Sequence, residues 1–394
     1  MTAVRRYGLA VIASLTAILT FPVFAATASF PAPPGPASSG VAGSYGGVWV
    51  SGTTTGSSWL SGVSCTAAFT CTAVGGAVPY PGGANRSAAP VVAYFDGSSW
   101  IIEPTDTTDS GSVLTAVACT PTLSRLCLAL GSDGASSYAL IEGADGTWTQ
   151  TAPMIRVAQN IGFDGAACPS RTRCIAAGDS YNSVSTPAPL VESWNGKSWH
   201  VAKLAAVGRG GGLSSVSCAT DRLCVAVGST PGPSGTYRPL AFEWTGGPAW
   251  QRASLEDPSK FTAGFSGVSC VKSSCTAVGS AGAAVFTETW HDGSWSNPFL
   301  YSVPRTTLDP MAISCVSGGA CVVVGNTVVA VGPATFGAVE KDGRWSSFST
   351  SRFPPGIQAL TCSQVAGACV IVGGGSPYAN TTGVEPAQAG VFSY

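Results

Sequence analysis

Short apolar runs that end in glycine recur along the chain. Residues 225–227, 322–324 and 370–372 are such runs, and each follows a cysteine and precedes a glycine. A second run with alternating small and apolar residues lies upstream, as in residues 215–217. Short runs that are rich in β-branched residues and bounded by turn residues predict β-strands. Long apolar stripes with the helical period of 3.6 do not occur.

The two runs and their cysteines form a unit that is repeated seven times and uses all 14 cysteines. The first cysteines of successive pairs lie 54, 49, 50, 52, 45 and 47 residues apart. A period of roughly 40 to 50 residues is typical of four-stranded propeller blades. The pairs are Cys65 and Cys71, Cys119 and Cys127, Cys168 and Cys174, Cys218 and Cys224, Cys270 and Cys275, Cys315 and Cys321, and Cys362 and Cys369.

Each cysteine pair predicts a disulfide across a tight antiparallel turn, where a Cα separation of roughly 5.5 Å suits the bond. Metal binding is the alternative. Structural zinc sites usually place two to four residues between ligands and often use histidine. The spacers here hold four to seven residues, and the chain has only His200 and His291. We therefore expect seven local disulfides and no metal site.

A glycine turn followed by tryptophan is the second recurring element. Asp-Gly or Asn-Gly between apolar runs is a strong hairpin signal, because such turns need positive φ. This element adds two strands to each cysteine hairpin. The tryptophans, which we expect to pack the blades, are Trp100, Trp148, Trp199, Trp250, Trp295 and Trp345.

The two ends of the repeat region complement each other. Residues 388–394 predict a third strand of the last blade, and the sequence stops before a fourth. Residues 45–50 resemble the missing strand, and pairing the two would remove open sheet edges. The sequence therefore predicts an all-β, seven-bladed β-propeller over residues 45–394, with four strands and one local disulfide per blade.

The segment before the repeats has the composition of a secretory signal. Arg5 and Arg6 precede an apolar run from Leu9 to Phe21, and small residues follow. We expect a signal peptide over residues 1–25, cleaved after Ala25 or else after Ala28, and an Ala/Pro/Ser/Gly-rich linker over 26–44. An uncleaved membrane anchor is the alternative. Seven disulfides fit an oxidising compartment, so we expect a secreted protein, either free or associated with the cell wall.

Net charge argues against nucleic acid as a partner. The formal charge is −1, and removal of Arg5 and Arg6 with the signal peptide makes it −3, from 17 basic and 20 acidic residues. Such a chain offers no basic surface for a phosphate backbone. We also expect no membrane span after signal cleavage, no cofactor, and a monomer.

The Asp-Gly-x-x-Trp turns and the Ser-Cys…Cys-Val-Ala-Val-Gly hairpins resemble those of secreted bacterial β-propellers in the Asp-box (sialidase-type), or BNR-like, repeat families. The resemblance covers about residues 45 to 394. It implies a propeller in which the Asp, Gly and Trp of the turn have a structural role. The chain departs from the Asp-box because it lacks the residue between Asp and Gly and the preceding Ser.

One glutamate recurs in the third strand of five blades, and we assign the set to one equivalent, structural position that holds backbone or a neighbouring blade. These residues are Glu142, Glu192, Glu243, Glu288 and Glu340. Inter-blade ligand sites are the alternative role. The two histidines fit no Ser/His/Asp arrangement. A pair of catalytic carboxylates could be drawn from Asp106, Asp109, Asp164, Asp179, Glu256 and Asp257.

Strand order places the cysteine turns and the glycine turns on one face of the ring. The loops between second and third strands and the connections between blades lie on the other, which we name the long-loop face. Irregular loops on a rigid scaffold usually carry function. Aromatic, amide and arginine side chains suit sugar binding, although the tyrosines could instead pack their own loops. The candidate ligand-binding residues are Tyr80, Asn85, Arg86, Arg156, Asn160, Tyr181, Asn182, Arg209, Tyr237, Arg238, Tyr378 and Asn380.

These observations favour a binding or interaction module over an enzyme. The expected partner is a cell-envelope or environmental polysaccharide, or another extracellular protein. A carbohydrate-active hydrolase or lyase is the first alternative, and it requires two carboxylates that converge in a central pocket on the long-loop face. A structural envelope protein is the second alternative.

Overall fold

The computed structural model describes residues 46–49, 56–66, 70–79, 88–105, 111–121, 126–133, 136–143, 145–151, 154, 160–181, 187–208, 210–256, 262–302, 306–329, 332–341, 343–350, 353, 356–363, 367–374 and 387–393. The chain divides into two compact units, Met1–Ser38 and Ser39–Tyr394, and every described residue belongs to the second. The signal peptide and the linker predicted over residues 1–44 lie outside the described residues and stay predictions.

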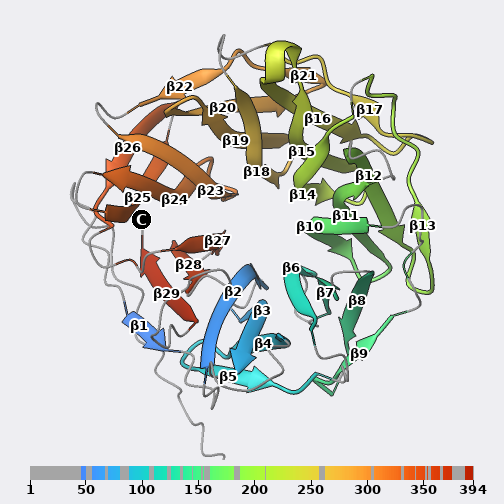
Figure 1. Ribbon diagram of the computed structural model, residues 1–394, viewed down its shortest axis with the longest axis vertical. Coiled ribbons are helices and arrows are strands. Elements are labelled where there is room, and N and C mark those ends of the chain that lie inside the picture. The colour runs from blue at the N-terminus through green and yellow to red at the C-terminus, as the bar shows by residue number, and fades with distance from the viewer. Residues whose placement is uncertain are drawn as a thin grey trace, which may run out of the picture. The chain divides into compact units, whose positions relative to one another are not determined.

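Seven antiparallel sheets form a ring of blades, each with its first strand innermost (Figure 1). The first blade has β2 (Gly56–Cys65), β3 (Cys71–Pro79), β4 (Ala89–Phe95) and β5 (Trp100–Glu103). The second has β6 (Val113–Cys119), β7 (Cys127–Ser132), β8 (Ser137–Glu142) and β9 (Trp148–Gln150). The third has β10 (Asn160–Ser170), β11 (Arg173–Tyr181), β12 (Pro187–Trp194) and β13 (Trp199–Val201).

The fourth blade has β14 (Gly212–Thr220), β15 (Leu223–Pro231), β16 (Tyr237–Trp244) and β17 (Gln251–Arg252), with a short 3₁₀ helix η1 (Pro233–Gly235) before β16. The fifth has β18 (Ala263–Val271), β19 (Ser274–Ala281), β20 (Ala284–His291) and β21 (Ser294–Trp295), and β22 (Phe299–Tyr301) also pairs with β20. The sixth has β23 (Thr307–Cys315), β24 (Cys321–Val329), β25 (Gly332–Lys341) and β26 (Arg344–Phe348). The seventh combines β27 (Ile357–Cys362), β28 (Ala368–Gly373) and β29 (Gln388–Ser393) with β1 (Gly46–Trp49).

Closure of the ring by the N-terminal strand is confirmed. β1 pairs antiparallel with β29, from Gly46 opposite Val391 to Trp49 opposite Gln388. The last and first blades also meet directly, because the backbone N–H of Ala387 donates to Ser58 Oγ at 2.8 Å. Apolar side chains of both blades share one core cluster. The N-terminal strand therefore supplies the fourth, outermost strand of the seventh blade.

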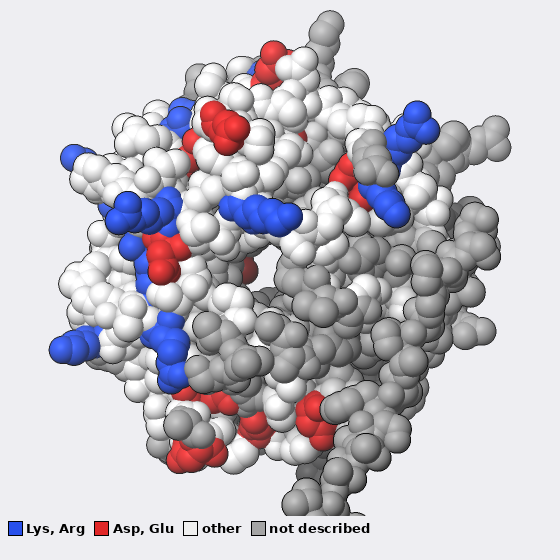
Figure 2. Space-filling model, turned by 180° about the vertical axis from the view of Figure 1, so that it is seen from behind, with Lys and Arg blue, Asp and Glu red and all other residues white. Residues whose placement is uncertain are grey.

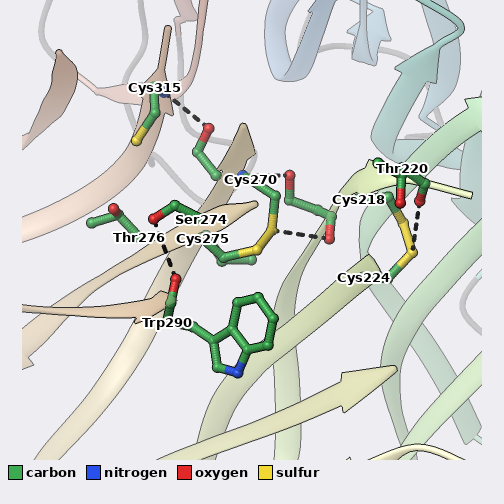
Figure 3. Close-up of a disulfide and its surroundings, with 12 residues drawn as sticks. Cys218, Thr220, Cys224, Cys270, Ser274, Cys275, Thr276, Trp290 and Cys315 are labelled. Carbon is green, nitrogen blue, oxygen red and sulfur yellow. Dashed lines mark hydrogen bonds between the residues drawn. A yellow bond between two sulfur atoms is a disulfide. The ribbon is translucent and has the colours of Figure 1, made fainter. Parts of the chain in front are cut away.

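All seven predicted disulfides are present, each within its own blade, and Figure 3 shows Cys218–Cys224 and Cys270–Cys275 in neighbouring blades. The Cα separations of the seven bonds lie between 3.9 and 4.1 Å, shorter than the roughly 5.5 Å expected. Cross-strand pairing accounts for part of the difference, because facing residues of an antiparallel ladder can approach to about 4.5 Å. Cys218 and Cys224, for example, are direct partners in the register of β14 and β15.

The five recurring glutamates do not share one position, so that prediction was wrong. Glu340 pairs with Cys321 itself, whereas Glu243 pairs with the residue after the second cysteine of its blade. Glu192 and Glu288 pair with the second residue after it. Because side chains alternate along a strand, Glu243 projects to the opposite side of its blade from Glu288. The distance from this register to the glycine turn differs between blades, so the sequence motif does not align the glutamates.

A structural role does hold for two of these glutamates. Glu243 Oε1 accepts a hydrogen bond from Trp295 Nε1 of the next blade at 2.7 Å. Glu340 Oε1 accepts one from the backbone N–H of Gly343 in its own turn. The buried Trp148 likewise donates from Nε1 to Glu103 of the preceding blade, at 2.8 Å. Tryptophan and glutamate thus join neighbouring blades at the outer part of the ring.

Candidate functional site

The central channel is a large cavity among the described residues. It has a volume of about 920 Å³ and is lined by residues from the first strand of every blade. Figure 2 shows its opening through the ring, with acidic atoms at its wall. A concave site bounded by several elements is where propellers and other rigid scaffolds present ligand-binding side chains.

A β-bulge at the same place in every first strand directs one residue into this channel. The pairing of each first strand with its second strand skips one residue, and a bulge residue of this kind leaves the ladder and re-aims its side chain. All seven skipped residues line the channel, and Asp164 is the only ionisable one. They are Ser61, Thr115, Asp164, Ser214, Ser266, Met311 and Gln358.

The glycine that closes each apolar run explains how the chain accommodates the bulge. A Cβ atom at Gly228 would overlap the carbonyl oxygen of Gly212 in the neighbouring first strand. The same overlap would occur between Gly178 and Gly162. The bulge brings the two backbones too close for any side chain, so this glycine is a structural requirement of the repeat.

Asp164 is the bulge residue of β10 and is exposed to the channel. Protein from the surrounding blades nevertheless crowds its carboxyl group. This burial, and after it the charge of Asp179, raises the pKa of Asp164 from 3.8 to about 6. The group can therefore exchange a proton close to neutral pH.

Asp179 lies at the boundary between the third and fourth blades. It is on β11, pairs in register with Gly162 of β10, and its carboxylate lies against Gly212 of β14. Burial raises the pKa of Asp179, and a hydrogen bond from the Tyr181 hydroxyl opposes that rise. The charge of Asp179 is in turn the main reason why the pKa of Tyr181 is raised, and Asp164 and Tyr237 add to the effect.

Tyr237 completes the cluster from the next blade. It begins β16, lines the channel and is 49% exposed, while Tyr181 is 39% exposed. We name Asp164, Asp179, Tyr181 and Tyr237 the channel-mouth cluster. Its chemistry is two carboxyl groups that can accept or donate hydrogen bonds beside two accessible phenol rings. The described residues that line the channel include no lysine or arginine.

The structure places few of the twelve candidate residues predicted from the sequence. It places Tyr181 near Tyr237, which lines the channel, and it places Arg238 in a separate groove. For Asn160 only the backbone is described, which begins β10 opposite Tyr181. The remaining candidates lie outside the described residues and stay predictions: Tyr80, Asn85, Arg86, Arg156, Asn182, Arg209, Tyr378 and Asn380.

Two of the carboxylates considered for catalysis meet in the cluster, and sequence reasoning had not singled them out. The charge of Asp179 helps to raise the pKa of Asp164, whereas Glu256 lines the separate groove. Asp106, Asp109 and Asp257 lie outside the described residues. Among the described residues, no group of three or more His, Cys, Asp or Glu side chains could hold a metal ion. In the same part of the chain, no helix has the length and apolar character to cross a membrane.

No family model matches this chain, and no curated protein matches it, so the resemblance to the Asp-box families gains no support. Solved structures do resemble it. YCF48 bound to D1 peptide is 10% identical, covers 88% of this chain and 96% of its own, and has a TM-score of 0.55. A catalytically inactive virginiamycin B lyase from Staphylococcus aureus with quinupristin is 7% identical, covers 89% and 100%, and also has a TM-score of 0.55.

A streptogramin B lyase is 9% identical, covers 88% of this chain and 96% of its own, and has a TM-score of 0.52. Identities this low show a common fold and carry no activity or ligand across. The comparisons therefore support the seven-bladed propeller and, in general terms, a scaffold on which both binding and catalytic proteins are built.

Proposed function

We propose that this protein is an extracellular binding module whose ligand site is the channel-mouth cluster. The observation that carries the proposal is the convergence of two carboxyl groups and two accessible tyrosines from neighbouring blades. Seven disulfides and the predicted signal peptide support an oxidising location outside the cell.

A carbohydrate is the ligand class that best suits this chemistry. The flat face of a tyrosine ring packs against the apolar face of a sugar, and the carboxylates of Asp164 and Asp179 accept hydrogen bonds from its hydroxyl groups. An acidic ligand would face negative charge without a cation among the described lining residues. We therefore expect a neutral glycan of the cell envelope or the environment.

Binding of the oxidised protein to neutral oligosaccharides and purified cell-wall fractions tests this function. Tyr181→Ala, Tyr237→Ala and Asp164→Asn should each weaken binding about tenfold or more, which corresponds to the loss of one stacking or charged hydrogen-bond contact. Phe299→Ala is the matched control, because Phe299 is an exposed aromatic on β22 away from the channel. Circular dichroism verifies that each variant is folded.

If all four variants bind as tightly as the unmodified protein, the ligand binds outside the channel-mouth cluster. If no glycan or wall fraction binds, the carbohydrate class is wrong, and capture of a defined extracellular protein partner becomes the remaining form of the binding function.

A hydrolase or lyase is the second candidate, because Asp164 lines the central channel and a second carboxylate, Asp179, is close enough to raise its pKa. A carboxyl group with a pKa of about 6 can act as a general acid near that pH. The test is release of new chain ends from the glycans that bind. Asp164→Asn should abolish turnover while a folded protein remains, and the absence of turnover in the unmodified protein would exclude this candidate for those substrates.

A further inference from the structure

A second pocket of the described residues lies on the fourth blade, apart from the channel. It is a groove of about 380 Å³. Three segments form its walls: the connection from the third blade at Val207 and Gly208, the hairpin between β15 and β16, and the end of β17 with the chain after it, at residues 252–256. The volume is that of a site for a small ligand.

Two arginines give this groove its charge. Arg238 and Phe242 alternate onto the same side of β16, and Arg252 of β17 pairs in register with Phe242. Both arginine side chains therefore project from the same side of the blade, from backbone positions that are roughly 13 Å apart along the strand. Both line the groove, so a ligand there can meet one guanidinium at each end.

The rest of the lining is mostly apolar. Pro231, Pro233, Pro239 and Leu255 supply rigid, apolar contact, and Glu256 is the only acidic residue of the lining that is described. Among the described residues, the lining holds two guanidinium groups and one carboxylate. Arginine binds carboxylate and phosphate groups through paired N–H donors, so the groove favours an anion.

The groove and the channel differ in charge although they share a wall. Tyr237 lines the channel and the adjacent Arg238 lines the groove, and successive side chains of a strand point to opposite sides. The channel lining carries a carboxylate and no described cation, whereas the groove carries the two arginines. The two pockets therefore suit different ligand groups.

We infer that the groove is a second ligand site, which takes a small ligand carrying a carboxylate or phosphate group. This inference does not depend on the function proposed for the channel. Charge attraction to Arg238 and Arg252 supplies the affinity, and the proline-lined walls hold the body of the ligand. Because both arginines are exposed, binding should weaken as salt concentration rises.

D-glucuronate, inorganic phosphate and neutral D-glucose are the probes for a titration of the oxidised protein by calorimetry and NMR at low ionic strength. We expect glucuronate, phosphate or both to bind and glucose not to bind at this site. The double variant Arg238→Gln/Arg252→Gln should lose at least tenfold in affinity. Each single variant should lose less. Arg222→Gln, at the exposed cysteine turn of the same blade, is the control and should bind normally.

Competition between the two anions decides which group the site prefers, and either preference supports the inference. Asp164→Asn should leave anion binding unchanged, which separates this site from the channel. Two results would overturn the inference: binding of neither anion by the folded protein, or equal anion binding by the folded double variant.

Discussion

The hydroxyl oxygen of Ser217 in the fourth blade accepts a hydrogen bond from the backbone N–H of Cys270 in the fifth, at 3.0 Å. The disulfides themselves stay within single blades, but the serine before a cysteine thus binds the next blade. The same contact, at 2.9 to 3.0 Å, joins Ser64 to Cys119, Ser269 to Cys315 and Ser314 to Cys362. Figure 3 draws the bonds that reach Cys270 and Cys315 as dashed lines.

Ser217→Ala should lower the free energy of unfolding by about 1 kcal/mol, because it removes one such bond and leaves the N–H of Cys270 without that acceptor. The ring should still form, since Ala118 and Ala167 occupy the same place in two other blades. Denaturant unfolding of the oxidised protein measures the change. Ser254→Ala, on an exposed segment, is the control, and an equal loss in both variants would contradict a specific role for Ser217.

Removal of one disulfide should weaken the ring without dissolving it. Cys218→Ala/Cys224→Ala opens a loop whose ends are 6 residues apart, and loop-closure entropy predicts a loss of about 2 kcal/mol. The strands should stay paired, because backbone hydrogen bonds and the buried core of the blade remain. Denaturant unfolding without reductant tests this, and an unchanged unfolding free energy would show that the bond adds no stability.

Asp179→Asn should lower the pKa of Asp164. The charge of Asp179 is the second cause of the raised value and burial is the first, so the pKa should fall below about 6 and stay above the ordinary 3.8. An NMR titration that follows the side-chain carboxyl carbon of Asp164 measures it. Asp221→Asn, on the opposite face of the ring, is the matched control. An unshifted Asp164 would mean that the two carboxyl groups are not coupled.

Glu288 makes stability depend on pH. Both of its carboxyl oxygens are buried without a hydrogen-bond partner in the described structure. Burial, and after it the charge of Glu256, raises the pKa of Glu288 from 4.5 to about 7. Below pH 4.5 the group is protonated in both folded and unfolded chains. Between pH 4.5 and 7 only the unfolded chain ionises freely, so stability falls as pH rises, by about 3 kcal/mol in total.

Glu288→Leu should remove this pH dependence. Leucine fits the fold there, because Leu140 has the same register position in the second blade. The free energy of unfolding of the variant minus that of the unmodified protein should be about 3 kcal/mol larger at pH 8 than at pH 4. Unfolding free energies at the two pH values measure this difference. If this difference in unfolding free energy is the same at pH 4 and at pH 8, the pKa of Glu288 is not raised.

The fold could be predicted from the sequence because the cysteine hairpins and the glycine turns are local signals repeated at a steady period. Cys218, Cys224 and the run after them specify a hairpin through near neighbours alone. The glutamates could not be aligned in this way. The turn after the third strand has different lengths, and only the pairing of strands shows that Glu243 and Glu288 lie at different positions.

The site was harder to predict because it depends on a bulge. Asp164 follows an apolar residue in an ordinary strand, and nothing in its neighbours marks it as the residue that enters the channel. Gly178 is an indirect signal. The glycine after each apolar run indicates that the backbone of the adjacent strand lies too close for a side chain. Tyr181 and Tyr237 were among the twelve candidates because strand order alone places both of their loops on one face, and their role in ligand binding stays a prediction.

Ring closure has a consequence for the timing of assembly. Gly46 pairs with Val391, so the strand that precedes all others of the ring in the chain finds its partner only after the remaining blades have been made. Closing so long a loop costs entropy that no local contact offsets beforehand, and pairings between distant residues form slowly. β1 must therefore wait for its partner until β29 has been synthesised, and the outer edge of the seventh blade is the last part of the ring to be completed.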